Sequence, residues 1–323
     1  MSADEKVEIL ELVRKSPLNV VQTLRQLGVP RSTYYAWRQR QEAMGMAGLR
    51  DRKPVAQRVW NRLRDEEVRT VLHYTRKYPE FSSRELACRI TDDGRFSVSE
   101  SSVYRILRRE GLIQPAVIEG IQAAKEFYRK TTWVHELWQT DLTYFFVPSW
   151  GWYYLGGILD DFSRYLICCE VVRDMTGPTL SNLVQKAVEI TGMMKVPVQH
   201  KVKLLSDNGS GYISKPFNEY LDAVGIKHLF AARCHPQTCG KMERLNRTAK
   251  DRLGLVLYPS PGQLQEAVAA FWQWYNYERY HEAIGNLRPA DVYNGRSHQI
   301  LCHRAQLKRK TIQLRRQLNL CIA

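Results

Sequence analysis

Three carboxylates lie inside or at the ends of predicted strands and helices, where their side chains could do chemistry. Asp141 lies inside "WQTDLTYFFV" (138–147), an apolar and aromatic run with the composition of a buried strand. Asp207 ends a second strand-like run, "KLLSD", directly before an Asn-Gly turn signal, and Glu243 opens a helical stretch after "CHPQTCGKM". A carboxylate inside a strand is costly unless it is paired or bound to a metal, so Asp141 is the hardest of the three to explain as structural.

Brought together, these side chains form a hard-oxygen site. If the strand of Asp141 lies beside the strand of Asp207, the two anions become neighbours, and a cation between them relieves their repulsion. Carboxylates without a nearby cysteine or histidine pair suit Mg²⁺, with Mn²⁺ as a substitute, rather than zinc. Two such ions about 3.5–4 Å apart support in-line phosphoryl displacement by a water or a 3′-hydroxyl. We predict Asp141 as the bridging ligand, with Asp207 on one ion and Glu243 on the other.

Each acid also has a structural alternative. Asp207 can serve its turn, and Glu243 can be a helix-start charge favoured by the helix dipole. Asp160 and Asp161, in "LDDFSR", are rival acids at the hairpin between the second and third strands. We predict that Asp161 is structural, bonded to the turn or to Arg164.

Alternating strand and helix patterns from residue 136 onward must position the acids. The predicted order is a three-strand meander followed by alternating helices and strands, which gives one mixed sheet with helices on both faces. The predicted elements are strands at 138–147, 152–160 and 164–172, a helix at 179–191, a strand at 200–207, a helix at 215–225, a strand at 226–231, and helices at about 241–256 and 263–280.

Two helix-turn-helix patterns precede this region. Residues 5–40 read as three short helices, the third opening with Arg31, Ser32 and Thr33 after a Gly-containing turn. Residues 82–111 repeat the pattern, and Arg105, Arg108 and Arg109 lie on the second helix of that pair. A plain three-helix bundle is the alternative for the first unit. The basic balance of the chain favours DNA binding by these arginines and hydroxyls.

The composition of the chain narrows the class of its binding partner. The 323 residues carry a formal charge of +15 with 44% hydrophobic residues, too apolar for disorder and basic enough to favour a polyanion, nucleic acid before membrane. No apolar run is long enough to span a bilayer and the start lacks a signal-peptide core, so we expect a cytoplasmic, nucleoid-associated protein. The seven cysteines, odd in number and irregularly spaced, do not describe a disulfide framework. A zinc site at Cys234, His235 and Cys239 lacks a second ligand pair nearby.

The runs "WQTDLTYF", "LLSDNGSGY" and "HPQTCGKMERLNRT" closely resemble the catalytic core of insertion-sequence transposases with a retroviral-integrase-type fold. In that family 35 residues typically separate the last two acids, and here residues 208–242 lie between Asp207 and Glu243. The trailing "WYNYERYHEAIGNLRPADVY" and the tandem helix-turn-helix front also resemble the family. The resemblance implies an RNase H-like fold, Mg²⁺ dependence, hydrolysis at element ends and joining of 3′-hydroxyls to target DNA.

Cations near Glu243 are the best candidates for phosphate contacts. They are Lys241, Arg244, Arg247 and Lys250, which we expect to follow the DNA backbone rather than read its sequence. Arg279 and His281 either touch DNA or are structural. The basic stretch 303–320 either clamps DNA, packs on a second protomer or is a solvated face. Joining needs two DNA ends held together, so we expect a homodimer or a larger assembly on double-stranded DNA.

The expected domains are a helix-turn-helix (1–42), a linker (43–62), a second helix-turn-helix (63–113), a linker (114–135), the catalytic core (136–293) and a basic tail (294–323). Three functions fit this order: a DNA transposase, a structure-selective nuclease of the same fold, and a domesticated DNA-binding regulator. A nuclease does not need two helix-turn-helix units, and a regulator tolerates loss of an acid. All three acids and both helix-turn-helix patterns are present, which favours the transposase.

Overall fold

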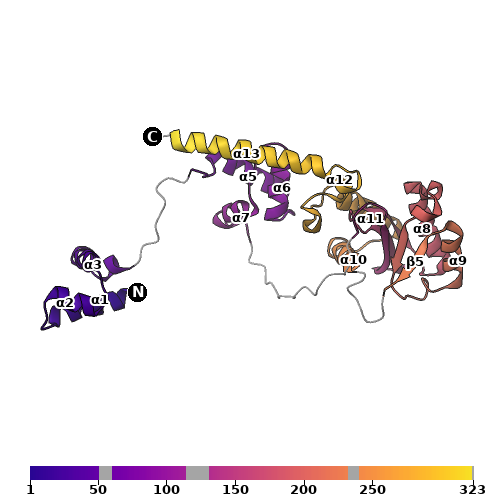
Figure 1. The fold of residues 1–323 in the computed structure, drawn as a ribbon. Coiled ribbons are helices and arrows are strands. Elements are labelled where there is room, and N and C mark those ends of the chain that lie inside the picture. The colour runs from indigo at the N-terminus through magenta and orange to yellow at the C-terminus, as the bar shows by residue number, and fades with distance from the viewer. Residues whose placement is uncertain (51–59, 114–130, 232–239, 322–323) are drawn as a thin grey trace. The chain divides into compact units, whose positions relative to one another are not determined.

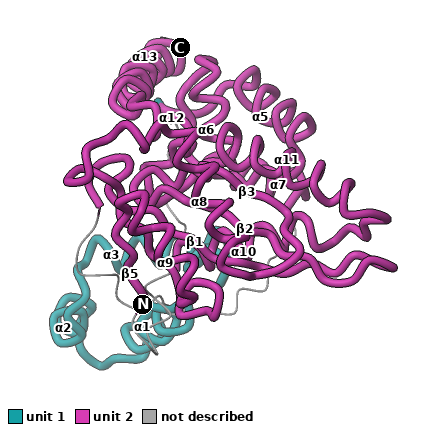
Figure 2. Tube along the Cα trace, turned by 90° about the vertical axis from the view of Figure 1, so that its right-hand side faces the viewer, with its two compact units in different colours: residues 1–60, 322–323 teal, residues 61–321 magenta. Residues whose placement is uncertain are grey.

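The computed structural model describes residues 1–50, 60–113, 131–231 and 240–321. The chain divides into two compact units, one within residues 1–60 and one within residues 61–321 (Figures 1 and 2). The smaller unit is all helical, and the larger combines helices with the sheet.

Four helices form the smaller unit: α1 (Ala3–Lys15), α2 (Val20–Gln26), α3 (Arg31–Met44) and α4 (Met46–Leu49). Ser2 and Asn19 cap α1 and α2 by accepting backbone N–H groups that the first turn leaves unpaired. Gly28, at φ 66°, makes the left-handed turn that leads into α3. The α2–turn–α3 pair is the predicted helix-turn-helix, whereas the short α4, whose Leu49 joins the core, was not predicted.

The larger unit begins with a second helical group. It comprises α5 (Asp65–Lys77), α6 (Ser83–Asp92) and α7 (Glu100–Arg109), packed around Val71, Leu86, Ile90 and Val103. Ser82 caps α6 and Ser99 caps α7, as their positions in the sequence predict. The turn between these two helices contains Gly94 at φ 70°.

A five-stranded mixed sheet in the order β3-β2-β1-β4-β5 forms the centre of the larger unit. Its strands are β1 (Leu137–Val147), β2 (Gly151–Asp160), β3 (Leu166–Val172), β4 (Lys203–Ser206) and β5 (Lys227–Phe230). The meander β1–β2–β3 is antiparallel, and β4 and β5 run parallel to β1. This is the predicted mixed-sheet, RNase H-like core with helical DNA-binding-type domains before it, and the fold class is confirmed.

Helices cover both faces of the sheet (Figure 1). One core joins the sheet to α8 (Gly177–Thr191) and α9 (Lys215–Val224), and a second joins it to α10 (Gly240–Leu253) and α11 (Pro261–Tyr277). Trp138 and Leu204 belong to the first core, and Phe145 and Val147 to the second. Successive residues of a strand point to opposite faces, so β1 contributes to both cores.

Strand β4 is shorter than the predicted 200–207. Residues before it form the single turns η1 (Met193–Lys195) and η2 (Val198–His200), and β4 starts at Lys203 opposite the beginning of β1. Because β4 pairs with β1 only from Leu137 to Gln139, Asp141 lies two residues past the end of that ladder.

The chain continues after the sheet through η4 (Glu282–Ile284), α12 (Pro289–Tyr293) and α13 (Ser297–Cys321). Helix α13 packs along the α5–α7 group (Figure 1). Arg315 forms a buried ion pair with Glu67, its Nη2 3.0 Å from Oε1, and Arg304 pairs with Asp92 over 2.6 Å. This part of the basic tail is therefore a structural helix of the larger unit.

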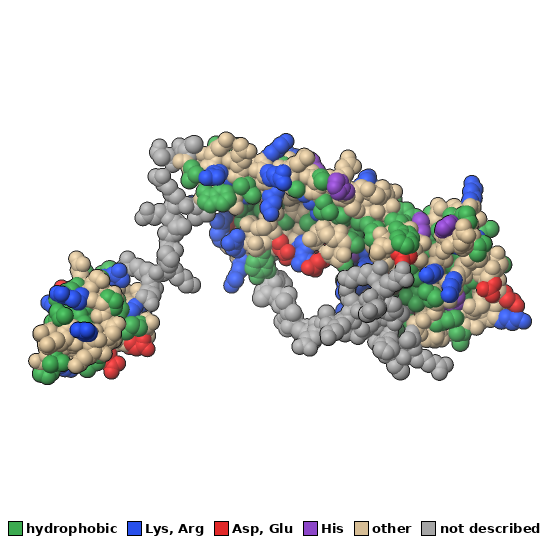
Figure 3. Space-filling view, viewed as in Figure 1, with side chains coloured by type: hydrophobic (Ala, Val, Ile, Leu, Met, Phe, Trp, Pro, Cys, Tyr) green, Lys and Arg blue, Asp and Glu red, His purple; other side chains and the backbone are tan. Residues whose placement is uncertain are grey.

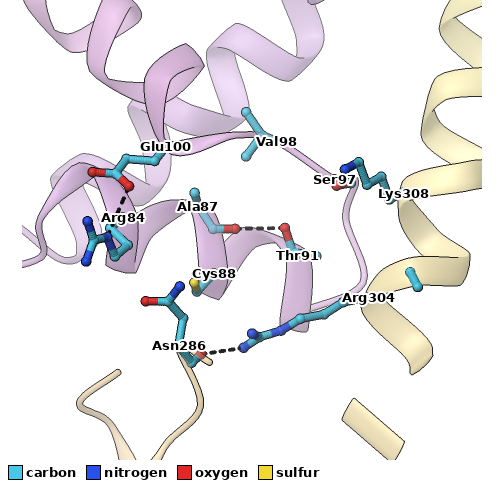
Figure 4. A pocket seen from close by; sticks show the side chains of 11 residues that line it. Arg84, Ala87, Cys88, Thr91, Ser97, Val98, Glu100, Asn286, Arg304 and Lys308 are labelled. Atoms are coloured by element: carbon cyan, nitrogen blue, oxygen red, sulfur yellow. Dashed lines mark hydrogen bonds and ion pairs between the residues drawn. The ribbon is translucent and has the colours of Figure 1, made fainter. Parts of the chain in front are cut away.

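An open pocket of about 290 Å³, lined by polar and apolar side chains, lies where α13 meets α6. Figure 4 shows Arg304 donating to the backbone carbonyl of Asn286 at 3.0 Å on one side, and the Arg84–Glu100 ion pair at 3.0 Å on another. The first contact joins α13 to the segment before α12, and the second joins α6 to α7.

Candidate active site

Asp141 sits in the middle of β1, opposite Gly157 of β2, and is half-buried. Its Oδ1 accepts the backbone N–H of Leu142 at 2.8 Å, and its Oδ2 accepts the side-chain amide of Asn246 at 2.8 Å. The short β4 leaves this part of β1 without a neighbour on that side in the described ladder. Two hydrogen bonds therefore hold the Asp141 carboxylate, and it lies on a part of β1 that does not pair with β4.

The electrostatics of Asp141 connect the three predicted acids. Burial, together with the negative charges of Asp207 and Glu243, raises the pKa of Asp141 to about 6, against the smaller opposing effect of its two hydrogen bonds. Asp141 thus lies within electrostatic range of both Asp207 and Glu243.

Asp207 follows directly after β4 and is exposed. Its Oδ1 accepts the backbone N–H of Gly209 at 3.0 Å, so one oxygen serves the turn, in line with the structural alternative. A Cβ on Gly209 would lie 3.0 Å from that same oxygen. Glycine at this position therefore leaves room for the Asp207 carboxylate. The turn that binds this carboxylate also sets its place in the candidate site.

Glu243 lies in the first turn of α10 and is exposed. The opposite face of the helix buries Met242, Leu245 and Ala249 against the sheet, which fixes the side that Glu243 presents. Three predicted phosphate contacts, Arg244, Arg247 and Lys250, are exposed along the same helix. The carboxylate and the cations thus share one solvent-facing side of α10.

Lys241, the fourth predicted phosphate contact, is engaged within the fold. Its Nζ forms an ion pair with Asp161 Oδ2 at 2.5 Å. Asp161 is buried and also accepts hydrogen bonds from Gln139 and Thr131. The structural role predicted for Asp161 is confirmed, with Lys241 among its partners and Arg164 bonded to its backbone carbonyl.

The donor set fits a divalent cation. Burial and the charges of Asp207 and Glu243 raise the pKa of Asp141, and a cation would offset the negative charge of these three hard carboxylates. In the described ranges, however, no group of three or more His, Cys, Asp or Glu side chains is already close enough to hold a metal ion. The carboxylates therefore interact through their charges and are not packed as a ready-made ligand shell.

The sequence analysis missed one partner of the site, Asn246. It lies three residues after Glu243, which puts it on the same side of α10. That spacing was a usable signal, because a side chain beside Glu243 on α10 is placed to reach the strand.

Arg279 and His281 contact aromatic rings of the fold. Arg279 lies over the ring of Trp274, 5.5 Å from its centroid, and His281 is edge-on to Tyr275, with ring centroids 4.9 Å apart. Both therefore have structural contacts on α11.

The predicted DNA contacts of the helical groups are at the surface. Arg31 and Ser32 are exposed at the start of α3 and Thr33 is half-buried, while Arg105, Arg108 and Arg109 are exposed on α7. Figure 3 shows Lys and Arg side chains on its visible face around α7 and along α13. The residues Cys234, His235 and Cys239 lie outside the described residues.

Models of two kinds of domain match the chain. The integrase core domain matches residues 132–236 and again residues 224–289, and a homeodomain-like domain matches residues 1–50 and residues 33–107. The integrase core matches include the positions of all three acids. The resemblance to an integrase-type core with helix-turn-helix domains in front is thereby confirmed.

Relatives of known sequence include retroviral polyproteins. The chain is 26% identical over 127 residues to the Gag-Pol polyprotein of avian reticuloendotheliosis virus, which covers 39% of this chain and 10% of the polyprotein. It is 30% identical over 131 residues to the Gag-Pro-Pol polyprotein of Mason-Pfizer monkey virus, covering 39% of this chain and 7% of the polyprotein. The chain thus spans a tenth or less of the length of these relatives.

Solved structures with a similar trace include two from retroviruses. A simian T-cell lymphotropic virus intasome in complex with a PP2A regulatory subunit matches at 16% identity and a TM-score of 0.44, covering 67% of this chain and 72% of that chain. The HTLV-2 integrase catalytic core domain in complex with magnesium matches at 19% identity and a TM-score of 0.38, covering 50% of this chain and 97% of that chain.

Among the helices of the described residues, none combines the length and the apolar character needed to cross a membrane.

Proposed function

The chain carries an integrase core domain together with homeodomain-like helix-turn-helix domains, an arrangement typical of insertion-sequence transposases, and from this we propose that it is a DNA transposase. It binds the ends of a mobile element, cleaves phosphodiester bonds there and joins the 3′-hydroxyl ends to target DNA. The observation that carries the proposal is the electrostatic coupling of Asp141 to Asp207 and Glu243. Asp141 in β1, Asp207 directly after β4 and Glu243 on α10 would form one metal-binding site.

The residues around the acids hold the DNA and orient the site. Arg244, Arg247 and Lys250 extend from Glu243 along the exposed side of α10 and bind phosphates. Asn246 holds Asp141 through its Oδ2, and the N–H of Leu142 holds the other oxygen. The carboxylate is thereby fixed in orientation before any substrate arrives.

Asp141, Asp207 and Glu243 would hold two Mg²⁺ ions, which supply activation of the attacking oxygen and stabilisation of the leaving oxygen. Mn²⁺ has the same preference for oxygen ligands and would substitute. A carboxylate ligand must be deprotonated, and the pKa of Asp141 near 6 places this requirement just below neutral pH. The related HTLV-2 core was solved with magnesium, which supports the choice of ion.

The helical groups select the DNA. Exposed Arg31 and Ser32 at the start of α3, and Arg105, Arg108 and Arg109 on α7, supply two recognition helices for a long, asymmetric site. Joining needs two DNA ends in one complex, so the working form is a homodimer or larger. The related intasome, a complex by its title, supports an assembly.

Strand-specific cleavage of a duplex carrying the gene's own flanking ends tests the proposal. The reaction is run with Mg²⁺, with Ca²⁺, and with Asp207→Asn, and the exposed Asp251→Asn on the same helix as Glu243 is the matched control. We expect nicks at defined ends with Mg²⁺ that disappear in Asp207→Asn and persist in Asp251→Asn. End-specific binding without cleavage under either metal would support a DNA-binding regulator instead. Cleavage governed by DNA shape, without preference for the ends, would support a nuclease.

A further inference from the structure

An exposed group of aromatic rings lies along one face of the β1–β2 hairpin. Tyr144, Phe146 and Trp152 are 55%, 53% and 55% exposed, and together they form what we term the aromatic platform. Trp152 meets the other two edge-on, with ring centroids 5.3 Å from Tyr144 and 5.2 Å from Phe146. Ring–ring contacts of this kind order the side chains without removing them from water.

The core of the protein does not require aromatic residues at these positions. On the opposite face of the same two strands, Phe145, Val147, Tyr153 and Leu155 are buried in the core that includes α10 and α11. A strand with one face packed normally carries polar side chains on the other face. Large aromatic groups gathered on the solvent face instead mark a binding surface.

The platform adjoins the helix of the candidate active site. Tyr144 is three residues after Asp141 on β1, so the two side chains leave opposite faces of the strand, and the link between them is α10. Lys250 of α10 holds its Nζ 4.4 Å from the centroid of the Tyr144 ring. A cation assigned above to phosphate therefore lies against the platform, on the helix that carries Glu243.

On the basis of the proposed function, we propose that the aromatic platform stacks an unpaired nucleobase of the DNA strand that is cut at Asp141, while Lys250 holds a neighbouring phosphate. Aromatic side chains stack on bases of any identity because every base has a π face. Bases inside a duplex are already stacked, so the occupant is a base released from pairing at an opened end.

Charge favours DNA over a second copy of the chain on this face. In the described residues, the charged group in ring contact with the platform is the Lys250 ammonium, and exposed Arg247 lies one turn before it on α10. A cation beside exposed rings is the combination found in sites for single-stranded nucleic acid. A homodimer contact is the competing occupant, and the experiment separates the two.

The test compares binding of the full chain to a blunt duplex and to the same duplex ending in an unpaired arm that contains 2-aminopurine. We expect the opened DNA to bind about tenfold more tightly and the 2-aminopurine fluorescence to be quenched by stacking. Trp152→Ala, and independently Phe146→Ser on the other strand, abolish the preference and the quenching while binding to the blunt duplex persists. Trp150→Ala is the matched control, since Trp150 is 52% exposed but outside the two ring pairs.

Each other outcome overturns a defined statement. A preference that survives in both Trp152→Ala and Phe146→Ser, or that Trp150→Ala also removes, overturns the platform while leaving the transposase proposal intact. Failure of the unmodified chain to bind either DNA counts against the proposed function itself. If Trp152→Ala converts a dimer into a monomer in sedimentation and the preference for opened DNA persists, a second copy occupies the face. Thermal melting of each variant shows that it is folded.

Discussion

Asn246 on α10 donates its side-chain amide to Asp141 Oδ2 on β1 across 2.8 Å, joining residues 105 positions apart in the chain. The bond favours the charged form of the carboxylate, because it lowers the pKa of Asp141 while burial and the two neighbouring acids raise it. Asn246 therefore acts through Asp141, as a positioning residue of the candidate site.

Replacing Asn246 with Ala should slow end cleavage about tenfold or more, since a hydrogen bond to a charged group contributes about 1.5–3 kcal/mol. Loss of the bond also raises the pKa of Asp141 further, so the acid limb of the pH–rate profile should move to higher pH. Single-turnover nicking across pH measures both effects. The matched control is Thr248→Ala, whose hydroxyl bonds only to the carbonyl of Arg244 on its own helix in the described contacts. An unshifted profile in Asn246→Ala would contradict the positioning role.

The ion pair between Glu67 and Arg315 is buried, each side chain being 5% exposed. Arg315→Met should lower the free energy of unfolding by about 3–5 kcal/mol, because it leaves the Glu67 carboxylate buried without its cation. The double variant Glu67→Leu with Arg315→Met should lose less, since no charge then stays buried. Urea unfolding of the full chain gives both values.

The exposed pair Lys215–Glu219 is the control for that experiment, with side chains 85% and 64% exposed. Lys215→Met should change the free energy of unfolding by less than about 1 kcal/mol. Equal losses at the two pairs would show that burial is not what makes the Glu67–Arg315 pair matter.

Substitution of Gly209 should lower activity with little change in stability. In Gly209→Ala the new methyl group would lie 3.0 Å from Asp207 Oδ1 and press on the carboxylate. We expect Mg²⁺-dependent cleavage to fall about tenfold while the melting temperature changes little, because the surrounding turn is exposed. Gly262→Ala on α11, where the nearest atom to the new methyl is Ser260 Oγ at 3.8 Å, should leave cleavage unchanged. Full activity in Gly209→Ala would remove the link between this turn and the site.

His228 on β5 should make the fold sensitive to mild acid. Burial lowers the pKa of His228 from about 6.5 to about 4, and its ring nitrogens contact Asn218 and Ser206. Below pH 6.5 the unfolded chain takes up a proton that the folded chain does not, so stability falls as pH drops from about 6.5 toward 4. His228→Gln should flatten this fall in melting curves collected between those pH values, whereas the exposed His200→Gln should not. A parallel fall in His228→Gln and the unmodified chain would exclude His228 as a cause.

Arg108 on α7 should contact DNA phosphate. Arg108→Ala should weaken binding to all duplexes by a similar factor and make the slope of log affinity against log salt less negative by about one. Arg76→Ala, exposed at the end of α5, is the control and should leave both unchanged. A slope that Arg108→Ala leaves unaltered would place DNA elsewhere on this unit.

The sheet and the acids were predictable because their signals are local. Alternating aromatic and β-branched runs joined by short turns specify the meander, and the Asn-Gly turn marks where Asp207 leaves its strand. The prediction for β4 began three residues too early, because β4 starts at Lys203 opposite Leu137, the first residue of β1, and residues 198–200 form a turn. Pairing range is a property of two strands, and neither run of sequence contains it.

Helix α5 and the position of α13 were not predicted. Their decisive contact, Glu67 with Arg315, joins residues 248 apart, and no periodicity within either helix identifies the partner. The same holds for Lys241, which was expected to contact DNA phosphate. It instead pairs with Asp161, 80 residues away in the chain. Charged side chains carry no local sign of whether they meet solvent, DNA or another side chain.

The pairing of Glu67 with Arg315 sets an order for biosynthesis. The α5–α7 group emerges from the ribosome early, but its buried carboxylate receives a cation only after α13 has been made. Until then the face of the α5–α7 group that α13 covers is open to water, and we expect the nascent helix-turn-helix to be protease-sensitive. Arrest of translation after α12, followed by brief proteolysis, measures this, and equal resistance before and after α13 would refute it. If the proposed function holds, a DNA-binding module that is completed by α13 would engage an element end only after the catalytic core has been made.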